Sequence, residues 1–136
     1  SDRMSDEEIE RKIAVIFATD VVGYSKHIEI DESGTIKNLQ ACEKLFTGLL
    51  SKHKGRLFNT GGGSFIEEFI SAVSAVQCAV DFQNAISARN AKHETTVKLE
   101  FRIGINSGDV IREKDNLMDD GVNIAVRLEA LAQTMV

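Results

Sequence analysis

A short apolar run near the N-terminus constrains the fold more than any other part of this sequence. Residues 12–18 are rich in isoleucine, valine, alanine and phenylalanine, and Asp20 and a glycine turn at Gly23 follow directly. The length and β-branched content of the run favour a central strand over a helix. We therefore predict a buried strand that delivers one carboxylate to a sheet edge, beside backbone that can approach a ligand closely. Residues 24–30 would form a linker or a short helical turn.

Helix and strand patterns alternate after this run. An amphipathic repeat over residues 31–52 begins with acidic residues and predicts a helix, with Gly55 as its C-cap. A glycine-rich turn at 59–64 separates two short apolar runs, 56–58 and 65–69, which is typical of a β-hairpin.

A second amphipathic helix is predicted from Ser71, a candidate N-cap, to about Asn90. The residues expected to mark its apolar face are Ala72, Val73, Val76, Ala79, Val80 and Ile86. The remaining predicted elements are an alternating strand at 97–103, a turn at 106–108, a strand start at 109–111, a charged loop at 112–120 and a last helix at 122–133.

The predicted order of strand, helix, strand, strand, helix, strand indicates an α+β fold. It is the order of the split βαβ, or ferredoxin-like, arrangement, an antiparallel sheet with both helices on one face. The strands at 12–18 and 65–69 are neighbours in this topology, so Asp20 should lie close to the turn at 59–64. We expect a single domain over residues 12–136, preceded at residues 1–11 by an expression remnant and a lead-in.

Composition narrows the classes of function. The net charge of −5 and the lack of a basic stripe argue against nucleic-acid binding, and no apolar run approaches the roughly 18 residues of a membrane span. Cys42 and Cys78 lie in amphipathic patterns without metal-ligand spacing, so we expect reduced core thiols in a cytoplasmic protein. His27, His53 and His93 are isolated, and we expect them at the surface.

Asp20 has two interpretations on the residues alone. It could be half of a carboxylate pair that holds two metal ions about 3.5–4 Å apart, or it could simply cap the following turn. The turn at Gly61–Gly63 has no acid, and no Gly-Lys-Ser/Thr follows it, so a Walker-type phosphate loop is excluded. Of the neighbours Glu67 and Glu68, at most one can face the same side of the sheet as the site.

Asn123 and Arg127 are a second candidate pair. They are four residues apart, so on the last predicted helix they would lie on one face. An amide and a guanidinium could together hold a ribose oxygen and a phosphate as charge builds. The alternative is an ordinary exposed polar stripe.

Taken together, these segments resemble the catalytic domain of class III nucleotide cyclases, the adenylate and guanylate cyclases, and most of all their stand-alone bacterial branch. The matching segments are residues 17–25, 55–63, 68–69, 101–108 and 120–129. The resemblance implies that ATP or GTP is converted to the 3′,5′-cyclic nucleotide with release of pyrophosphate, a phosphorus–oxygen lyase reaction of intracellular signalling. It also implies that the chain ends before the C-terminal strands of the family.

In this family two domains pair head to tail, and each site lies at the interface and uses two Mg²⁺ or Mn²⁺ ions. The resemblance implies that Asp20 and the Val21 carbonyl bind metal. It assigns phosphate binding to Val22, Gly23 and Tyr24, and transition-state stabilisation to Asn123 and Arg127.

Three positions depart from the family pattern. The second metal-binding aspartate falls at Gly63, and the purine-selecting lysine and aspartate fall at Asn59 and Asn116. Two asparagines can still bind a purine edge, whereas a lost carboxylate should weaken metal binding. The chain is then either an impaired cyclase, as a homodimer or as a heterodimer with a complete cyclase domain, or a catalytically inactive domain that dimerises or binds nucleotide to regulate another protein. A purely structural ferredoxin-like domain would make these matches accidental.

Overall fold

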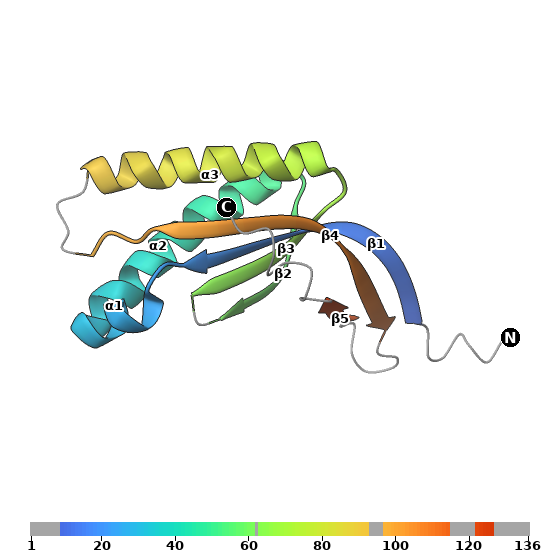
Figure 1. Ribbon diagram of the computed structural model, residues 1–136, viewed down its shortest axis with the longest axis horizontal. Helices are drawn as coiled ribbons and strands as arrows, with labels where there is room; N and C mark the ends of the chain where they lie inside the picture. Colours follow the sequence, from blue (N-terminus) through green and yellow to red (C-terminus); the bar gives the residue numbers. More distant parts are fainter. Residues whose placement is uncertain (1–8, 62, 93–96, 115–121, 127–136) are drawn as a thin grey trace, which may run out of the picture.

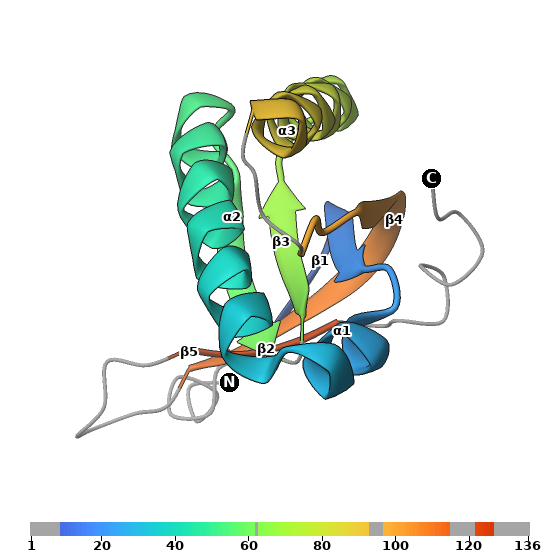
Figure 2. The ribbon, with the colours of Figure 1, turned by 90° about the vertical axis from the view of Figure 1, so that its left-hand side faces the viewer.

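The computed structural model describes residues 9–61, 63–92, 97–114 and 122–126, without the side chains of 9–12, 58–61, 109–114 and 122–126. The elements are β1 (Ile9–Val21), α1 (Tyr24–Ile30), α2 (Glu32–Lys52), β2 (Arg56–Gly61), β3 (Ser64–Phe69), α3 (Ala72–Lys92), β4 (Phe101–Lys114) and β5 (Val122–Val126). The strands form one five-stranded antiparallel sheet in the order β2-β3-β1-β4-β5. Helices α2 and α3 cover one face of it, so the predicted ferredoxin-like α+β fold is confirmed (Figures 1 and 2).

β1 lies at the centre of the sheet. It pairs with β3 from Val15↔Phe69 to Asp20↔Ser64 and with β4 along its whole length. Side chains alternate between the two faces of a strand. Phe17 and Val21 accordingly belong to the core under the helices, and Asp20 lies on the opposite face, away from the helices.

An aromatic cluster holds the helices on the sheet. The ring centroid of Phe46 on α2 lies 5.5 Å from that of Phe17, 5.5 Å from that of Phe65 and 5.0 Å from that of Phe82. These rings come from β1, β3 and α3, so a single side chain joins four elements. Contacts of this kind add about 0.5–1.5 kcal/mol each beyond the burial of their area.

β1 and β4 are longer than predicted. The predicted turn at 106–108 is wrong, because these residues pair with Ile16, Val15 and Ala14 and continue β4. Residues 9–11, expected in the lead-in, pair with 111–113. The outer halves of both strands project beyond the helices as an arm that carries β5 (Figure 1).

The segment before β4 was predicted as part of a strand, but regular pairing begins only at Phe101. Side-chain amides take the place of a neighbouring strand here. The carbonyls of Val97, Leu99 and Phe101 accept hydrogen bonds of 2.9 Å from Asn38, Asn90 and Gln83 respectively. We call these three side chains the amide ladder. Buried carbonyls need partners, and the helices supply them.

The last predicted helix is wrong for its first five residues. Val122–Val126 is a strand that pairs with β4 from Val110↔Val126 to Lys114↔Val122. β-branched residues occupy every second position of this segment, and the long β4 offers an edge for them to pair with. Residues 127–133 of the predicted helix lie outside the described residues.

The buried face of helix α3 agrees with the predicted one at Ala79 and Ile86 and differs elsewhere. Its buried residues are Ala75, Cys78, Ala79, Phe82 and Ile86. The expected Val73, Val76 and Val80 are 65%, 50% and 52% exposed. Two apolar stripes compete on this helix, and the stripe that carries the large ring of Phe82 faces the core.

The helix ends follow local rules with one exception. The Asp31 carboxylate accepts from the Gly34 N–H at 3.0 Å, and the predicted Ser71 cap accepts from the Ser74 N–H at 3.2 Å. After α2, the residue with positive φ is Lys54, at 60°, and not Gly55. The Gly55 N–H donates to the Leu50 carbonyl at 2.8 Å, which completes a Schellman motif.

The burial of both cysteines and of one histidine can also be compared with the predictions. Cys42 and Cys78 are free and buried, as expected. His53 is not a surface residue: its side chain is 11% exposed, and Nε2 lies 2.8 Å from Oδ2 of Asp81 on α3. This hydrogen bond is the main cause that lowers the pKa of Asp81.

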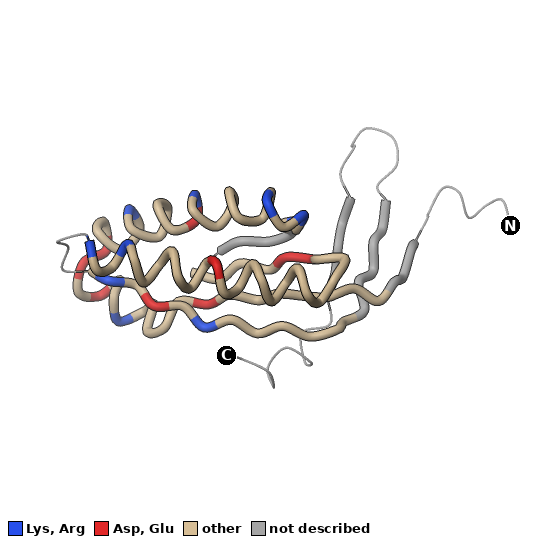
Figure 3. The backbone as a smooth tube through the Cα atoms, turned by 90° about the horizontal axis from the view of Figure 1, so that it is seen from above, with Lys and Arg blue, Asp and Glu red and all other residues tan. Residues whose placement is uncertain are grey.

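Within the described ranges, no helix is long and apolar enough to span a membrane. Lys and Arg are interspersed with Asp and Glu along α2 and α3 (Figure 3). This described surface therefore lacks the single-sign stripe that marks a nucleic-acid binder.

Candidate functional site

The end of β1 meets the β2–β3 hairpin, as the predicted topology requires. Asp20 lies opposite Ser64 in the sheet, and the Val21 N–H donates to the Gly63 carbonyl at 3.1 Å. The strand that ends on the carboxylate is therefore tied directly to the glycine turn. We call this edge, formed by residues 20–24 with Gly63 and Arg102, the rim.

Asp20 forms an ion pair that was not predicted. Its Oδ2 lies 2.7 Å from Nη2 of Arg102, which is directly opposite on β4. The two side chains are 38% and 54% exposed, so solvent screens the pair. Arg102 alternates with the buried Phe101 and Ile103, which marks it as outward-facing. That signal is present in the sequence, but only the register of β4 on β1 reveals its partner.

The turn after Asp20 is fixed by one backbone hydrogen bond and by the conformation of a glycine. The Val22 N–H donates to the Glu100 carbonyl at 2.9 Å, and Gly23 adopts a left-handed φ of 65° that favours glycine. Tyr24 then begins α1, and its side chain packs in part against the core. The three residues assigned to phosphate binding thus lie together beside Asp20.

The rim residues do not fit a two-carboxylate metal centre. Among the rim residues Asp20 provides the one carboxylate, and Gly63 has no side chain that could provide a second. Glu68 lies on the same face of the sheet as Asp20, but it is opposite Ile16, four residues back along β1, which is ~13 Å at strand spacing. Nowhere in the described part of the chain do three or more His, Cys, Asp or Glu side chains gather to hold a metal.

Glu67 faces the core and not the rim. It lies opposite Phe17, is 0% exposed, and its carboxyl oxygens have no hydrogen-bond partner among the described residues. Burial raises the pKa of Glu67 to about 9, so it is a neutral acid at pH 7. The expectation that only one of the two adjacent glutamates could face the site is confirmed.

The other predicted site residues are not placed at the rim. Asn59 lies in β2 opposite Ile66, and Asn123 in β5 opposite Glu113, but the side chains of both are outside the described part of the structure. Asn116 and Arg127 fall outside the described residues altogether. Because Asn123 is on a strand, the argument that a helix aligns it with Arg127 no longer holds.

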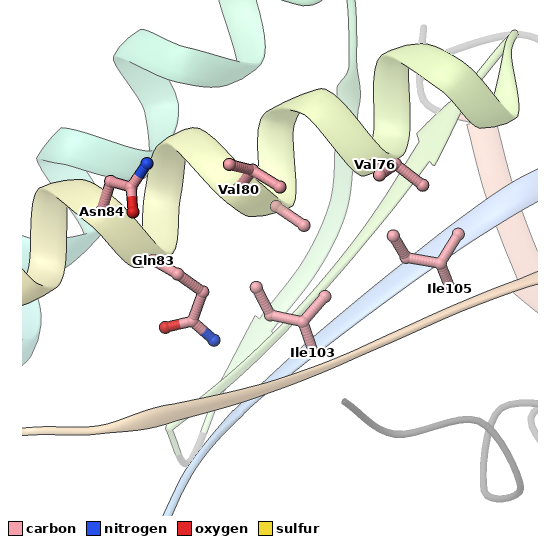
Figure 4. Close-up of a pocket in the computed structure, with 7 residues that line it drawn as sticks. Val76, Val80, Gln83, Asn84, Ile103 and Ile105 are labelled. Carbon is pink, nitrogen blue, oxygen red and sulfur yellow. The ribbon is translucent and has the colours of Figure 1, made fainter.

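A separate groove of about 580 Å³ lies between α3 and β4 (Figure 4). It is on the helix side of the sheet, away from Asp20. Its lining is mostly apolar and consists of Val76, Ala79, Val80, Gln83, Asn84, Ile103 and Ile105. These residues bring no titratable group, so the groove is not a reaction site in itself.

Comparison with known proteins agrees with this architecture. Residues 6–135 match the family described as "Adenylate and Guanylate cyclase catalytic domain". A protein of Rhizobium meliloti (strain 1021) named "Putative adenylate cyclase 3" is 42% identical over 130 residues. These residues cover 95% of this chain but only 22% of that protein.

Solved structures show the same fold. An adenylate/guanylate cyclase/hydrolase from Silicibacter pomeroyi is 26% identical with a TM-score of 0.69, and the match covers 85% of this chain and 65% of that one. The guanylyl cyclase Cya2 is 21% identical with a TM-score of 0.75, over 92% of this chain and 68% of that one. The chain belongs to the adenylate and guanylate cyclase catalytic domain family.

Proposed function

We propose that this chain is a purine nucleotide cyclase domain of reduced activity, which forms 3′,5′-cyclic nucleotide and pyrophosphate from ATP or GTP in cytoplasmic signalling. One observation carries the proposal. In a chain of this family, the turn at Val22–Tyr24 directly follows Asp20, and the Val21 N–H ties this end of β1 to the glycine turn at Gly63.

The reaction joins two parts of one nucleotide. The ribose 3′-oxygen attacks the α-phosphorus, loses its proton, and the bond from the α-phosphorus to the bridging oxygen breaks to release pyrophosphate. The Val22–Tyr24 turn would hold the phosphates. Arg102 would place positive charge beside Asp20, where the triphosphate concentrates negative charge.

The family relies on two divalent metal ions, and the rim offers one carboxylate for them. Loss of a carboxylate that both ions share should cost several kcal/mol, or about a thousand-fold or more in rate. A head-to-tail homodimer would carry the defect in both of its sites. In a heterodimer with a complete cyclase domain, the partner would hold the metals. Asn123 and Arg127 of this chain would then stabilise the transition state, and Asn59 and Asn116 would contact the purine.

The second candidate is a catalytically inactive domain that dimerises or binds nucleotide to regulate a partner. The Asp20–Arg102 ion pair favours it, because a carboxylate neutralised by a protein cation is less available to metal.

The deciding experiment mixes this chain with a complete cyclase domain whose own transition-state arginine is replaced by alanine. Cyclic nucleotide is measured from ATP and from GTP with Mn²⁺. We expect activity in the mixture that disappears when this chain carries Arg127→Ala and survives the exposed control Lys37→Ala. A mixture that stays inactive, although the two chains associate, would overturn the cyclase proposal in favour of the regulatory one.

A further inference from the structure

We propose that Thr19 and Glu67 form a binding site for one water molecule inside the core, on the helix side of the sheet. The site is separate from the proposed cyclase reaction, because neither residue belongs to the rim and the ligand is neither a nucleotide nor a metal. Burial, strand register and the hydrogen-bonding capacity of the two side chains support it.

Two polar side chains lie in the core without a hydrogen-bond partner. Thr19 is 1% exposed and Glu67 is 0% exposed. Oγ1 of Thr19 and both carboxyl oxygens of Glu67 are the buried side-chain atoms that lack a partner in the described part of the chain. Buried polar atoms nearly always have a partner in native structures, whether it is a protein group or an ordered water. These atoms therefore need a partner that the described residues do not supply.

The register of β1 on β3 brings the two side chains together. Thr19 lies opposite Phe65, and Phe17 lies opposite Glu67. All four side chains are buried, so they point to the same, helix-covered face of the sheet. Thr19 and Glu67 are therefore diagonal neighbours, about 7–8 Å apart at typical sheet spacing, which a long side chain can partly span. Because no direct hydrogen bond joins them, a small bridging molecule is needed to link them.

The chemistry of the pair suits water better than a cation. Burial raises the pKa of Glu67 to about 9, so at pH 7 its carboxyl group keeps its proton and can both donate and accept. A bound water can accept from the Glu67 hydroxyl and donate to the Glu67 carbonyl oxygen and to Oγ1 of Thr19. Three hydrogen bonds are typical of a buried water. A neutral carboxyl group, in contrast, provides no charge to hold a cation.

Buried side chains surround the site. Ile103 lies opposite Thr19 on β4 and is 0% exposed, and Phe65 is 1% exposed. Cys78 on α3 is also 0% exposed and lies near Glu67. Burial raises the pKa of its thiol to about 12, and the charge of an ionised Glu67 contributes to that rise. A water held between these residues is separated from bulk solvent, so it should exchange slowly.

Nuclear magnetic resonance of the isotope-labelled wild-type chain tests the site without any substitution. Cross-peaks between water and methyl protons are measured in laboratory-frame and rotating-frame experiments. We expect a cross-peak at the Thr19 methyl group that is several-fold stronger than the one at Thr35. Thr35 is a matched control, because it is 0% exposed and its hydroxyl already donates to the His27 carbonyl at 3.0 Å. No cross-peak at Thr19, or equal cross-peaks at both threonines, would overturn the proposal.

A mutant cycle supplies a second measurement. Thr19→Val and Glu67→Leu are introduced singly and together, and the melting temperature of each protein is compared with the wild type. The shift in the double variant should be smaller than the sum of the single losses, because no polar group is then left without its partner. Thr35→Val combined with Glu67→Leu should give additive shifts.

Additive shifts for Thr19→Val and Glu67→Leu would contradict a shared water. Coupling without a water cross-peak would mean that the two side chains bond directly, and the water site would then be wrong. Neither readout involves cyclic nucleotide, so the failure of the proposed function and the failure of this inference can be told apart.

Discussion

Asp20 and Arg102 face each other across β1 and β4, and their side chains are joined at 2.7 Å. The carboxylate that the proposed function assigns to metal binding is therefore already paired with a residue 82 positions away in the chain. Any divalent ion that binds at this rim must compete with that guanidinium.

Removing the competitor should strengthen metal binding. We expect Arg102→Gln to raise the affinity of the chain for Mn²⁺ several-fold, measured by calorimetry without nucleotide. The melting temperature should change little, because exposed ion pairs contribute about 0–1 kcal/mol. Adding Asp20→Asn to Arg102→Gln should abolish the gain. A gain that persists without the Asp20 carboxylate would show that the metal binds elsewhere.

Glu67 should make the fold less stable as pH rises. Its pKa is raised from 4.5 to about 9 in the folded chain, so between these values the unfolded chain ionises and the folded chain keeps the proton. The stabilisation that this proton provides is fully present below pH 4.5. As pH rises from 4.5 to about 9, the free energy of unfolding falls by up to ~1.4 kcal/mol per pH unit. The pKa of the neighbouring Cys78 is raised to about 12, so that thiol stays neutral over this window.

Glu67→Gln should therefore flatten the dependence of the melting temperature on pH between 5 and 9. The exposed control Glu29→Gln should leave the slope unchanged. If Glu67→Gln and the wild type lose stability in parallel, Glu67 is not the group that titrates.

Two glycines near α2 should respond in opposite ways to alanine. At Gly55 a Cβ would lie 2.6 Å from Cδ2 of Leu50 and 2.6 Å from Cζ of Phe69, so we expect Gly55→Ala to cost about 1–3 kcal/mol. At Gly48, inside α2, a Cβ meets nothing within 4 Å, so Gly48→Ala should gain roughly 0.5–1 kcal/mol. Chemical denaturation measures both, and equal effects would contradict the packing at Gly55.

Asn90, a member of the amide ladder, should contribute more to stability than the exposed Asn84 on the same helix. Asn90→Ala leaves the carbonyl of Leu99, whose side chain is 1% exposed, without its 2.9 Å hydrogen bond. We expect a loss of about 1–3 kcal/mol in the free energy of unfolding. Asn84→Ala, at an exposed position of the same helix, should stay within about 0.5 kcal/mol. Comparable losses at both positions would argue against the ladder.

Short sequence patterns predicted the parts of this fold that are determined by residues close together in the chain. The helix start at Asp31, the cap at Ser71 and the hairpin at 56–69 can be predicted from short stretches of sequence. The order of the elements predicted that Asp20 lies close to the glycine turn, and the Val21–Gly63 hydrogen bond confirms this closeness.

Features set by distant partners were not predictable in the same way. Asn106-Ser107-Gly108 has the composition of a turn, and only pairing with β1 makes it a strand. Arg102 can be recognised as outward-facing, but its contact with Asp20 depends on the register of two strands. The atoms that crowd the position of a Cβ at residue 63 belong to the ring of Tyr24, which comes from the start of a helix.

The amide ladder has one further consequence, which concerns solubility. An exposed strand edge with free carbonyls can recruit a strand from another molecule and begin aggregation. The carbonyls of Val97, Leu99 and Phe101 are already occupied by side chains of α2 and α3. The two helices therefore leave these carbonyls unavailable for pairing with a strand from another molecule.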